Sequence, residues 1–340
     1  WCASNRLFRN DGGWVFTEVT AAAGLADLGA GAGSTWGDVN GDGWLDLYLA
    51  NRTDTDCQTG AAPGNPNRLY LNQGDGTFLE VGAAWGVADG TARSFAPLFF
   101  DYDRDFDVDL FLAEDKGVQA GCAAWHNKLW RNDGGIALVE VSQTVGTAGC
   151  MNAMCATPGD LDHNGFPDIY VTNTSEGNEL YMNQGEHVFE EVSVDAGVNQ
   201  GGWGWGAAAV DIDNDADLDI LETNGWNLID DPSFLFLNNL DGTFTEAGVA
   251  SGINHVTQGR SILLLDHDTD GDVDIIFLSH LEPAFLFQND LTKDTGAGWL
   301  RVRLDNCGRA DLTPDGVGAH LELTAGGVTQ HRWITAAPSY

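Results

Sequence analysis

Basic side chains are scarce in this chain. Among 340 residues there are 15 Lys and Arg against 51 Asp and Glu, so the formal net charge is −36 at pH 7. No basic patch is present, which argues against nucleic-acid binding, because such binding depends on neutralising phosphates. A large charge excess is typical of disordered chains, but 43% of these residues are hydrophobic and fall in regular blocks, which argues against disorder.

Long apolar segments and catalytic signatures are also missing. No stretch approaches the ~18 consecutive apolar residues of a transmembrane helix. No secretory signal is visible, and the chain opens with Trp1 and Cys2 rather than Met, so we expect a processed or partial product. The GxSxG, HExxH, P-loop and strand–GxGxxG patterns are absent and the eight histidines are scattered, so the sequence does not indicate an enzyme.

The CxxC spacing of zinc and redox sites is absent as well. Six cysteines without that spacing are typical of disulfides, which indicates an oxidising, extracellular compartment. Cys150 and Cys155 are close enough in sequence to pair across a loop, although the sequence leaves the connectivity open.

Aspartate at fixed spacing is what the chain has in abundance. Nine-residue segments begin at Asp38, Asp101, Asp160, Asp211 and Asp266 and read DVNGDGWLD, DYDRDFDVD, DLDHNGFPD, DIDNDADLD and DHDTDGDVD. Positions 1, 3, 5 and 9 are always Asp or Asn, and such alternate oxygen ligands can converge on Ca²⁺, which takes about six to eight of them. These segments hold 21 of the 51 acidic residues, and five divalent cations would reduce the net charge from −36 to −26. Without metal, their repulsion should open the compact state.

Each aspartate loop lies inside a repeat of four expected strands. Consecutive loops are 63, 59, 51 and 55 residues apart, the range of a propeller blade. In the fourth repeat the pattern predicts strands over 206–210, 218–221, 234–237 and 243–246, with a hairpin turn between the last two. The strand that follows each loop is apolar throughout, which indicates burial on both faces between stacked blades. We predict an all-β propeller of four-stranded blades with Asp-rich calcium loops.

EF-hands are the main alternative for such loops. Their bidentate Glu at position 12 is present only in the fourth loop, as Glu222, and the expected flanking elements are strands instead of helices. Position 6 is Gly in three loops but Phe106 and Ala216 in the other two, which indicates that its turn is not uniformly required. Calcium-binding β-helices are excluded because their repeat is about nine residues long.

The repeats resemble a known family. The loop pattern together with LYLNQGDGTFLEV at 69–81, and its echoes at 7–25, 180–198 and 235–253, resembles the FG-GAP/VCBS repeats of integrin α-subunits and many secreted bacterial proteins. This resemblance covers residues 1–290 and implies a β-propeller.

The tail and the blade number complete the expected domain organisation. WLRVRL at 299–304 and DGVGAHLEL at 315–323 resemble the start of an ASPIC/UnbV domain, so we expect a small, partial β-domain over 296–340. Both parts together resemble the cartilage-acidic-protein-like family of secreted acidic propeller proteins, which favours seven blades. Five loops are visible and a strand pair over 6–18 precedes them, so the blade number stays open between five and seven.

The FG-GAP resemblance implies a ligand set for each calcium ion. Positions 1, 3, 5 and 9 would bind through their side chains and position 7 through its carbonyl, which would explain why position 7 varies from Trp to Asp. The predicted ligands of about five ions are Asp38, Asn40, Asp42, Trp44 and Asp46; Asp101, Asp103, Asp105, Asp107 and Asp109; Asp160, Asp162, Asn164, Phe166 and Asp168; Asp211, Asp213, Asp215, Asp217 and Asp219; and Asp266, Asp268, Asp270, Asp272 and Asp274. The alternative is that these aspartates only cap turns.

The function expected from these features is that of a secreted, calcium-stabilised and non-catalytic binding or adhesion module for extracellular proteins or glycans. Long connections carry Trp125 and Trp226, which can stack on sugars or anchor a protein, whereas Trp36, Trp203 and Trp205 are expected to pack. Two alternatives stay open. One is a calcium-dependent subunit of an extracellular filament or coat, assembled through strand edges. The other is a polysaccharide lyase or hydrolase, although the loop histidines His163 and His267 are expected to be solvated and not catalytic.

Overall fold

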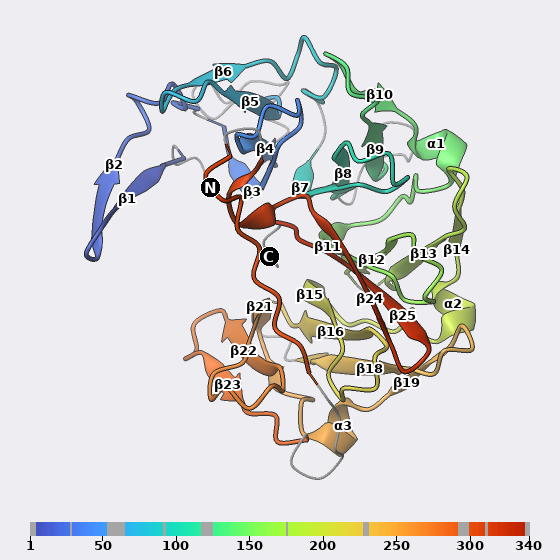
Figure 1. The fold of residues 1–340 in the computed structure, drawn as a ribbon. Coiled ribbons are helices and arrows are strands. Elements are labelled where there is room, and N and C mark those ends of the chain that lie inside the picture. Colours follow the sequence, from blue (N-terminus) through green and yellow to red (C-terminus); the bar gives the residue numbers. More distant parts are fainter. Residues whose placement is uncertain are drawn as a thin grey trace.

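Strands ordered around one axis dominate the protein. The computed structural model describes residues 5–27, 29–52, 65–90, 93–116, 125–174, 176–226, 231–291, 299–309 and 312–336. Within them five sheets follow one another around the axis as blades (Figure 1). The all-β propeller predicted from the sequence is confirmed.

Four blades have four strands in simple sequence order, and the fifth has three among the described residues. The strands are β3 (Gly31–Gly37), β4 (Asp46–Asn51), β5 (Arg68–Asn72) and β6 (Phe78–Glu80) in blade 1; β7 (Ser94–Phe100), β8 (Asp109–Glu114), β9 (Lys128–Arg131) and β10 (Val139–Glu140) in blade 2; β11 (Ala153–Gly159), β12 (Asp168–Asn173), β13 (Glu179–Asn183) and β14 (Phe189–Glu191) in blade 3; β15 (Gly204–Val210), β16 (Asp219–Asn224), β18 (Phe234–Asn238) and β19 (Phe244–Glu246) in blade 4; and β21 (Gly259–Leu265), β22 (Asp274–Ser279) and β23 (Phe285–Phe287) in blade 5.

Short elements connect the blades. One-turn helices follow the fourth strands of blades 2 to 4, and each ends at a glycine with positive φ: α1 (Ser142–Val145), α2 (Ser193–Ala196) and α3 (Gly248–Ser251). Strands β17 (Asp231–Pro232) and β20 (Val256–Thr257) pair with each other. No helix among the described residues is long and apolar enough to cross a membrane.

The core lies between neighbouring blades. The first strand of each blade packs against the first strand of the next, so these strands line the axis (Figure 1). Buried clusters fill each junction, such as Tyr48, Leu69, Phe99 and Leu110 between blades 1 and 2. Every residue of β4, β8, β12 and β16 is buried, which confirms the expected burial of the strand after the loop on both faces.

Blade 5 departs from this pattern. In β21 and β22 the side chains of Leu263, Leu265 and Leu278 are exposed, because no further described blade covers this face. At the other end of the series, β1 (Phe8–Gly12) and β2 (Val15–Glu18) form a hairpin that pairs only with itself, and the ring is open between it and blade 5 (Figure 1). The seven blades favoured by the resemblance are not found in the described residues, which form five.

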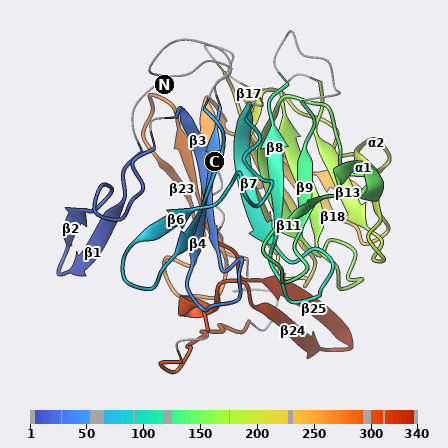
Figure 2. The ribbon, with the colours of Figure 1, turned by 90° about the horizontal axis from the view of Figure 1, so that it is seen from above.

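A second hairpin covers one face of the propeller. Strands β24 (His320–Ala325) and β25 (Val328–Trp333) pair with each other after a 3₁₀ turn, η1 (Pro314–Gly316), and lie below the blades (Figure 2). A bridge between Trp36 and Ala336 ties the segment to β3. The boundary predicted between residues 290 and 296 lies, apart from residue 291, outside the described residues.

The cysteines correct one expectation. Cys155 is buried on β11 and is not part of a disulfide, so the pairing with Cys150 that the spacing allowed is not formed. Cys307 is exposed and free. Cys2, Cys57 and Cys122 lie outside the described residues.

Candidate metal sites

All five aspartate loops emerge on the same face of the propeller. Each loop joins the first strand of a blade to its second strand, so loop 1 (38–46), loop 2 (101–109), loop 3 (160–168), loop 4 (211–219) and loop 5 (266–274) share one end of the axis. This is the face covered by the β24–β25 hairpin (Figure 2).

The loops share one backbone path. Positions 4 and 6 have positive φ in all five, including Phe106 at 76° and Ala216 at 88°. The expectation that the position 6 turn is not uniformly required is therefore wrong. An L-residue in this conformation is strained by ~1–2 kcal/mol, and such strain persists only where the surroundings impose it.

The aspartate at position 1 closes each turn. The carboxylate of Asp101 accepts the N–H of Arg104 at 2.7 Å and of Phe106 at 3.1 Å. Asp38 and Asp211 accept the N–H groups of positions 5 and 6 in loops 1 and 4. Turn capping, the alternative considered from the sequence, is therefore a real part of the loop's structure.

The carboxylates also converge, which capping alone does not require. In loops 2 to 5, three carboxylate oxygens lie within 4.8 Å of one another, and these groups could hold a metal ion. Loops 2 and 3 use positions 1, 3 and 9, and loops 4 and 5 use positions 1, 3 and 5: Asp101, Asp103 and Asp109; Asp160, Asp162 and Asp168; Asp211, Asp213 and Asp215; Asp266, Asp268 and Asp270. In loop 5, Asp274 forms a further group with His267 and Asp268. Loop 1, which has Asn40 at position 3, forms no such group among the described residues.

The remaining predicted ligands lie around these groups. Asp42, Asp105 and Asn164 at position 5 are exposed in loops 1 to 3, and Asp46 is buried at the end of loop 1. The role of the position 7 carbonyl as a ligand stays a prediction. The residues concerned are Trp44, Asp107, Phe166, Asp217 and Asp272.

The electrostatics of the groups favour a cation. Burial, together with the smaller effect of neighbouring aspartates, raises the pKa of Asp101 to about 6 and of Asp219 to about 7. Burial likewise raises the pKa of Asp109 and Asp168 well above the usual range. Asp160 Oδ1 and Asp213 Oδ1 are buried oxygens without a hydrogen-bond partner among the described residues. Buried, clustered and partly unsatisfied carboxylates fit a divalent cation, whose charge would hold them ionised.

Position 9 has a second role that links each loop to its blade. Asp109 accepts the N–H of Tyr102 within its own loop at 2.9 Å and the N–H of Asn132, at the end of the third strand, at 2.8 Å. The same pair of bonds is made by Asp46, Asp168, Asp219 and Asp274.

The asparagine after the third strand joins neighbouring blades, a role that the sequence analysis missed. The Asn132 side chain donates to the carbonyl of Val108 in its own loop and, at 2.8 Å, to that of Val39 in the preceding loop. Asn183, Asn238 and Asn289 bridge the next three junctions in the same way. The available signal was an Asn that recurs before the hairpin turn, as in LYLNQG at 69–74.

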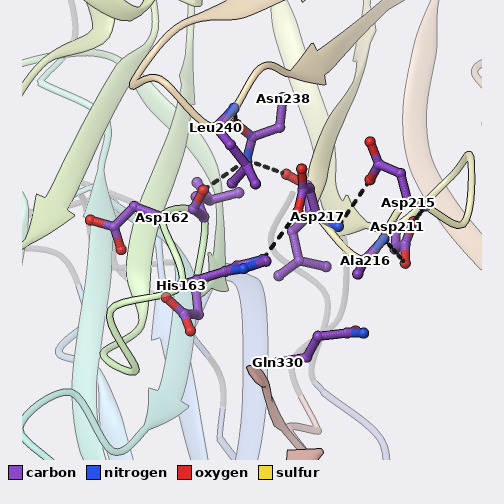
Figure 3. Close-up of polar contacts among 12 residues, drawn as sticks. Asp162, His163, Asp211, Asp215, Ala216, Asp217, Asn238, Leu240 and Gln330 are labelled. Atoms are coloured by element: carbon purple, nitrogen blue, oxygen red, sulfur yellow. Dashed lines mark hydrogen bonds and ion pairs between the residues drawn. The ribbon is translucent and has the colours of Figure 1, made fainter. Parts of the chain in front are cut away.

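Positions 4 and 7 form a further contact between loops. The Arg104 guanidinium lies over the Phe166 ring at 5.6 Å, His163 faces Asp217 at 3.3 Å (Figure 3), and Asn214 donates to Asp272 at 2.7 Å. Position 4 of one loop thus contacts position 7 of the next loop. The variety at position 7 therefore has a cause in side-chain contacts, and His163 is a junction residue, contrary to the solvated role expected for it.

His267 is also engaged within its loop. Its Nδ1 lies 2.6 Å from Asp274, which raises the pKa of His267. His267 is exposed, as expected for a solvated loop residue, and a loop carboxylate is its partner.

The segment that contains Arg301 and the covering hairpin brings positive charge to this acidic face. Arg301 pairs with Asp266 of loop 5. Burial lowers the pKa of Arg332 on β25, an effect that Asp211 and Asp160 oppose.

The fold and these loops define a class: the chain is a β-propeller, and part of it matches FG-GAP-like repeats. The FG-GAP-like repeat family matches residues 101–171 and 160–222, which contain loops 2 to 4. Among individual proteins, the chain is similar to cartilage acidic protein 1 of Xenopus tropicalis, with 28% identity over 269 residues that cover 74% of this chain and 40% of that protein. The human protein of the same name is 27% identical over 210 residues, covering 57% and 31%. The chain thus spans less than half the length of these relatives.

The chain also shows a weak structural similarity to solved structures. The exotype rhamnogalacturonan lyase YesX aligns with a TM-score of 0.43 at 14% identity, covering 76% of this chain and 47% of that one. Rhamnogalacturonan lyase YesW gives 0.44 at 14% identity, covering 76% and 49%. Structural similarity at this level does not indicate a shared function.

Proposed function

We propose that this chain is a calcium-stabilised, non-catalytic binding module of a secreted or cell-surface protein. The observation that carries the proposal is the convergence of buried carboxylates in loops that also connect the blades. Calcium is the divalent cation whose flexible, oxygen-only coordination suits such loops. By binding only the folded state, it would raise the free energy of unfolding.

The position of the loops favours a structural role for the ion over a catalytic one. The carboxylates at positions 1 and 9 already accept backbone N–H groups that set the loop and the blade junction. The β24–β25 hairpin lies over the same face (Figure 2). A substrate would have to displace these contacts to reach the ion.

An extracellular location and an extracellular protein or glycan partner belong to the same proposal. Millimolar calcium outside cells fills weak sites of this kind, and the relatives named for cartilage support this location. Disulfides among the remaining cysteines would be stable there.

Calcium titration by calorimetry of the chelator-stripped protein tests the proposal. We expect about five sites per chain, a monomer in size-exclusion chromatography, and a melting temperature that falls markedly in excess chelator. Asp103→Asn should remove one site, while Glu190→Gln, the same loss of charge on exposed β14, should remove none. An unchanged melting curve in chelator would refute structural calcium, and calcium-dependent cleavage of an acidic polysaccharide would refute the non-catalytic role.

A second function, calcium-dependent self-assembly, is favoured by blade 5. Its outer face exposes Leu263, Leu265, Leu278 and Leu286, and the third strand, β23, pairs with no fourth strand among the described residues. An apolar face beside an open strand edge is suited to pairing with another copy. If oligomers form with calcium and the Leu263→Glu variant no longer forms them, self-assembly becomes the favoured function.

A further inference from the structure

The tryptophans that precede and follow the inner strands of blade 4 pack against one another. Trp205 is buried, and Trp226 stacks on Trp203 at 5.4 Å and lies 5.4 Å from Trp205. The expectation that Trp203 and Trp205 pack is therefore confirmed, and Trp226 packs with them. A surface for a partner lies elsewhere, at the edge of β1.

The hairpin β1–β2 has the register of the outer half of a blade. Phe8 pairs with Glu18, and Asn10 pairs with Phe16. The third and fourth strands of blade 1 form the equivalent pairs, which are Tyr70 with Glu80 and Asn72 with Phe78. Among the described residues β1 pairs only with β2, so the strands that would come first and second in its blade are missing there. We call this hairpin the half-blade.

The half-blade packs against blade 1 in the way that one blade packs against the next. The N–H of Phe78 in β6 donates to the carbonyl of Ala23, which follows β2, at 2.9 Å. The N–H of Leu138, just before β10, donates to the carbonyl of Trp85 at 3.2 Å in the same way. The half-blade therefore holds the place of a blade that comes directly before blade 1 (Figure 1).

The junction between the half-blade and blade 1 is incompletely packed. The carbonyl of Leu7 accepts the N–H that follows the fourth strand, and its side chain is only half-buried. The leucines in the same position of blades 1 to 4 are at most 2% exposed: Leu69, Leu129, Leu180 and Leu235. A cavity of about 270 Å³ lies beside Leu7, with Trp36, Leu47 and Leu49 of blade 1 among its lining residues. At the next junction, Tyr48 and Ala50 of a second strand are buried in the core.

The asparagine bridges show which further groups this junction lacks. In blades 2 to 5 the asparagine donates to the position 8 carbonyl of its own loop and to the position 2 carbonyl of the preceding loop. Asn72 of blade 1 donates to Leu45, at position 8, but to no position 2 carbonyl among the described residues. Asn10 of the half-blade accepts the N–H of Gly12 at 2.9 Å, as Asn72 accepts that of Gly74, but its amide donates to no described loop carbonyl. One further aspartate loop would offer position 8 to Asn10 and position 2 to Asn72.

We propose that the edge of β1 binds a polypeptide segment of the form strand–aspartate loop–strand, which completes the blade that the half-blade begins. Its second strand would pair with β1, and the apolar side chains of that strand would fill the cavity beside Leu7. Strand addition to an open edge is a common mode of peptide recognition, in which backbone hydrogen bonds give affinity and side-chain pockets give specificity. This inference goes beyond the proposed function and does not depend on it.

The structure favours this occupant over two others. A single strand could pair with β1 but would bring no position 2 carbonyl to Asn72. A second copy of this chain has its described aspartate loops between strands that are already paired with their own third strands, so it would have to unfold a blade to donate one. A separate strand–loop–strand segment has neither disadvantage.

A synthetic peptide of residues 204–224, which spans β15, loop 4 and β16, is the probe. Hydrogen exchange of the calcium-loaded chain measures its binding. We expect the amides of β1 to exchange at least ~10-fold more slowly with the peptide than without it. The matched control is a peptide of residues 179–191, the outer hairpin β13–β14 of blade 3, which has no aspartate loop and should leave β1 unprotected. Asn10→Ala should weaken binding of the first peptide, whereas Asn239→Ala, at an exposed asparagine of blade 4, should not.

An isolated pair of strands is marginally stable in water, so a tethered form is the second measurement. The same segment, joined to residue 1 by a flexible linker of about ten residues, has a high effective concentration at β1. It should protect β1 and raise the melting temperature, and a tethered segment of scrambled sequence should do neither. Absence of protection by both the free and the tethered segment would overturn the inference, and so would equal protection by the control peptide. A dimer whose β1 amides are protected without any peptide would show that a second copy is the occupant, contrary to the proposal.

Discussion

At the scale of single residues, the asparagine at the end of the third strand is important in blades 2 to 5 because its side chain contacts two neighbouring blades. Asn238 is buried, and its amide donates to the carbonyl of Leu218 at 3.1 Å in its own blade and of Leu161 at 2.7 Å in the preceding one. Its backbone N–H also binds Asp219 at 2.9 Å. One side chain thus satisfies two buried acceptors at a junction between sheets.

Replacement of this residue tests that role. Asn238→Ala should lower the free energy of unfolding by about 2–3 kcal/mol, because two buried carbonyls lose their donor. Asn239→Ala, at the exposed neighbour, should change it by less than about 0.5 kcal/mol. Denaturant unfolding with calcium present measures both, and equal effects would contradict the bridging role.

Glu222 is the second residue with a distinct consequence. It is fully buried on β16, where it accepts bonds from Tyr170 and Asn178 at 2.6 Å, and burial raises its pKa to about 8. The folded state therefore holds this proton more tightly than the unfolded state. Its stabilising contribution is complete below the model-peptide value of about 4.5 and is lost as the pH rises to about 8.

A pH series measures this contribution. With calcium saturating, the melting temperature should fall between about pH 5 and pH 8, and Glu222→Gln should make that fall smaller. Glu190→Gln on exposed β14 should leave the fall unchanged. A slope unaffected by Glu222→Gln would show that this carboxyl does not retain its proton.

At the scale of elements, the aspartate loop shows what the sequence could and could not predict. Alternating Asp and Asn, repeated five times, located the loops, and the apolar runs after them located the buried second strands. The prediction for the turn at position 6 was wrong because Phe106 and Ala216 adopt a positive φ there, a conformation that only Gly signals in a sequence. The Asn bridges join residues 77 to 93 positions apart in the sequence, and no local pattern encodes such contacts.

Ala216 provides a test of the loop conformation. Ala216→Gly should raise the free energy of unfolding by about 0.5–1 kcal/mol, because relief of the left-handed strain exceeds the added freedom of the unfolded chain. Ala137→Gly, at an exposed alanine outside the positive-φ region, should instead lower it. A destabilised Ala216→Gly variant would mean that the alanine methyl group contributes packing that outweighs the strain.

At the scale of the whole molecule, negative charge is concentrated on one face. The loops on that face hold 21 of the 51 acidic residues. Repulsion within the acidic face opposes folding unless cations offset it. Calcium would offset this repulsion by binding at specific sites, whereas salt would screen all the charges weakly.

Salt dependence should therefore differ between the two states. In chelator, raising NaCl from about 0.01 M to about 1 M shortens the screening length from about 30 Å to about 3 Å and should raise the melting temperature by several degrees. With calcium bound, the same change should have a smaller effect. Equal shifts in both states would show that the loop charges are not the main source of repulsion.

The contact from position 4 of one loop to position 7 of the next has a direction. Loops 2, 3, 4 and 5 are joined in this order by Arg104 with Phe166, His163 with Asp217, and Asn214 with Asp272. The propeller is thus a series of unlike couplings between nearest neighbours, as in linear repeat proteins. The strength of the contact can therefore differ from one blade junction to the next. When the protein unfolds, the blades should separate first at the junction with the weakest contact.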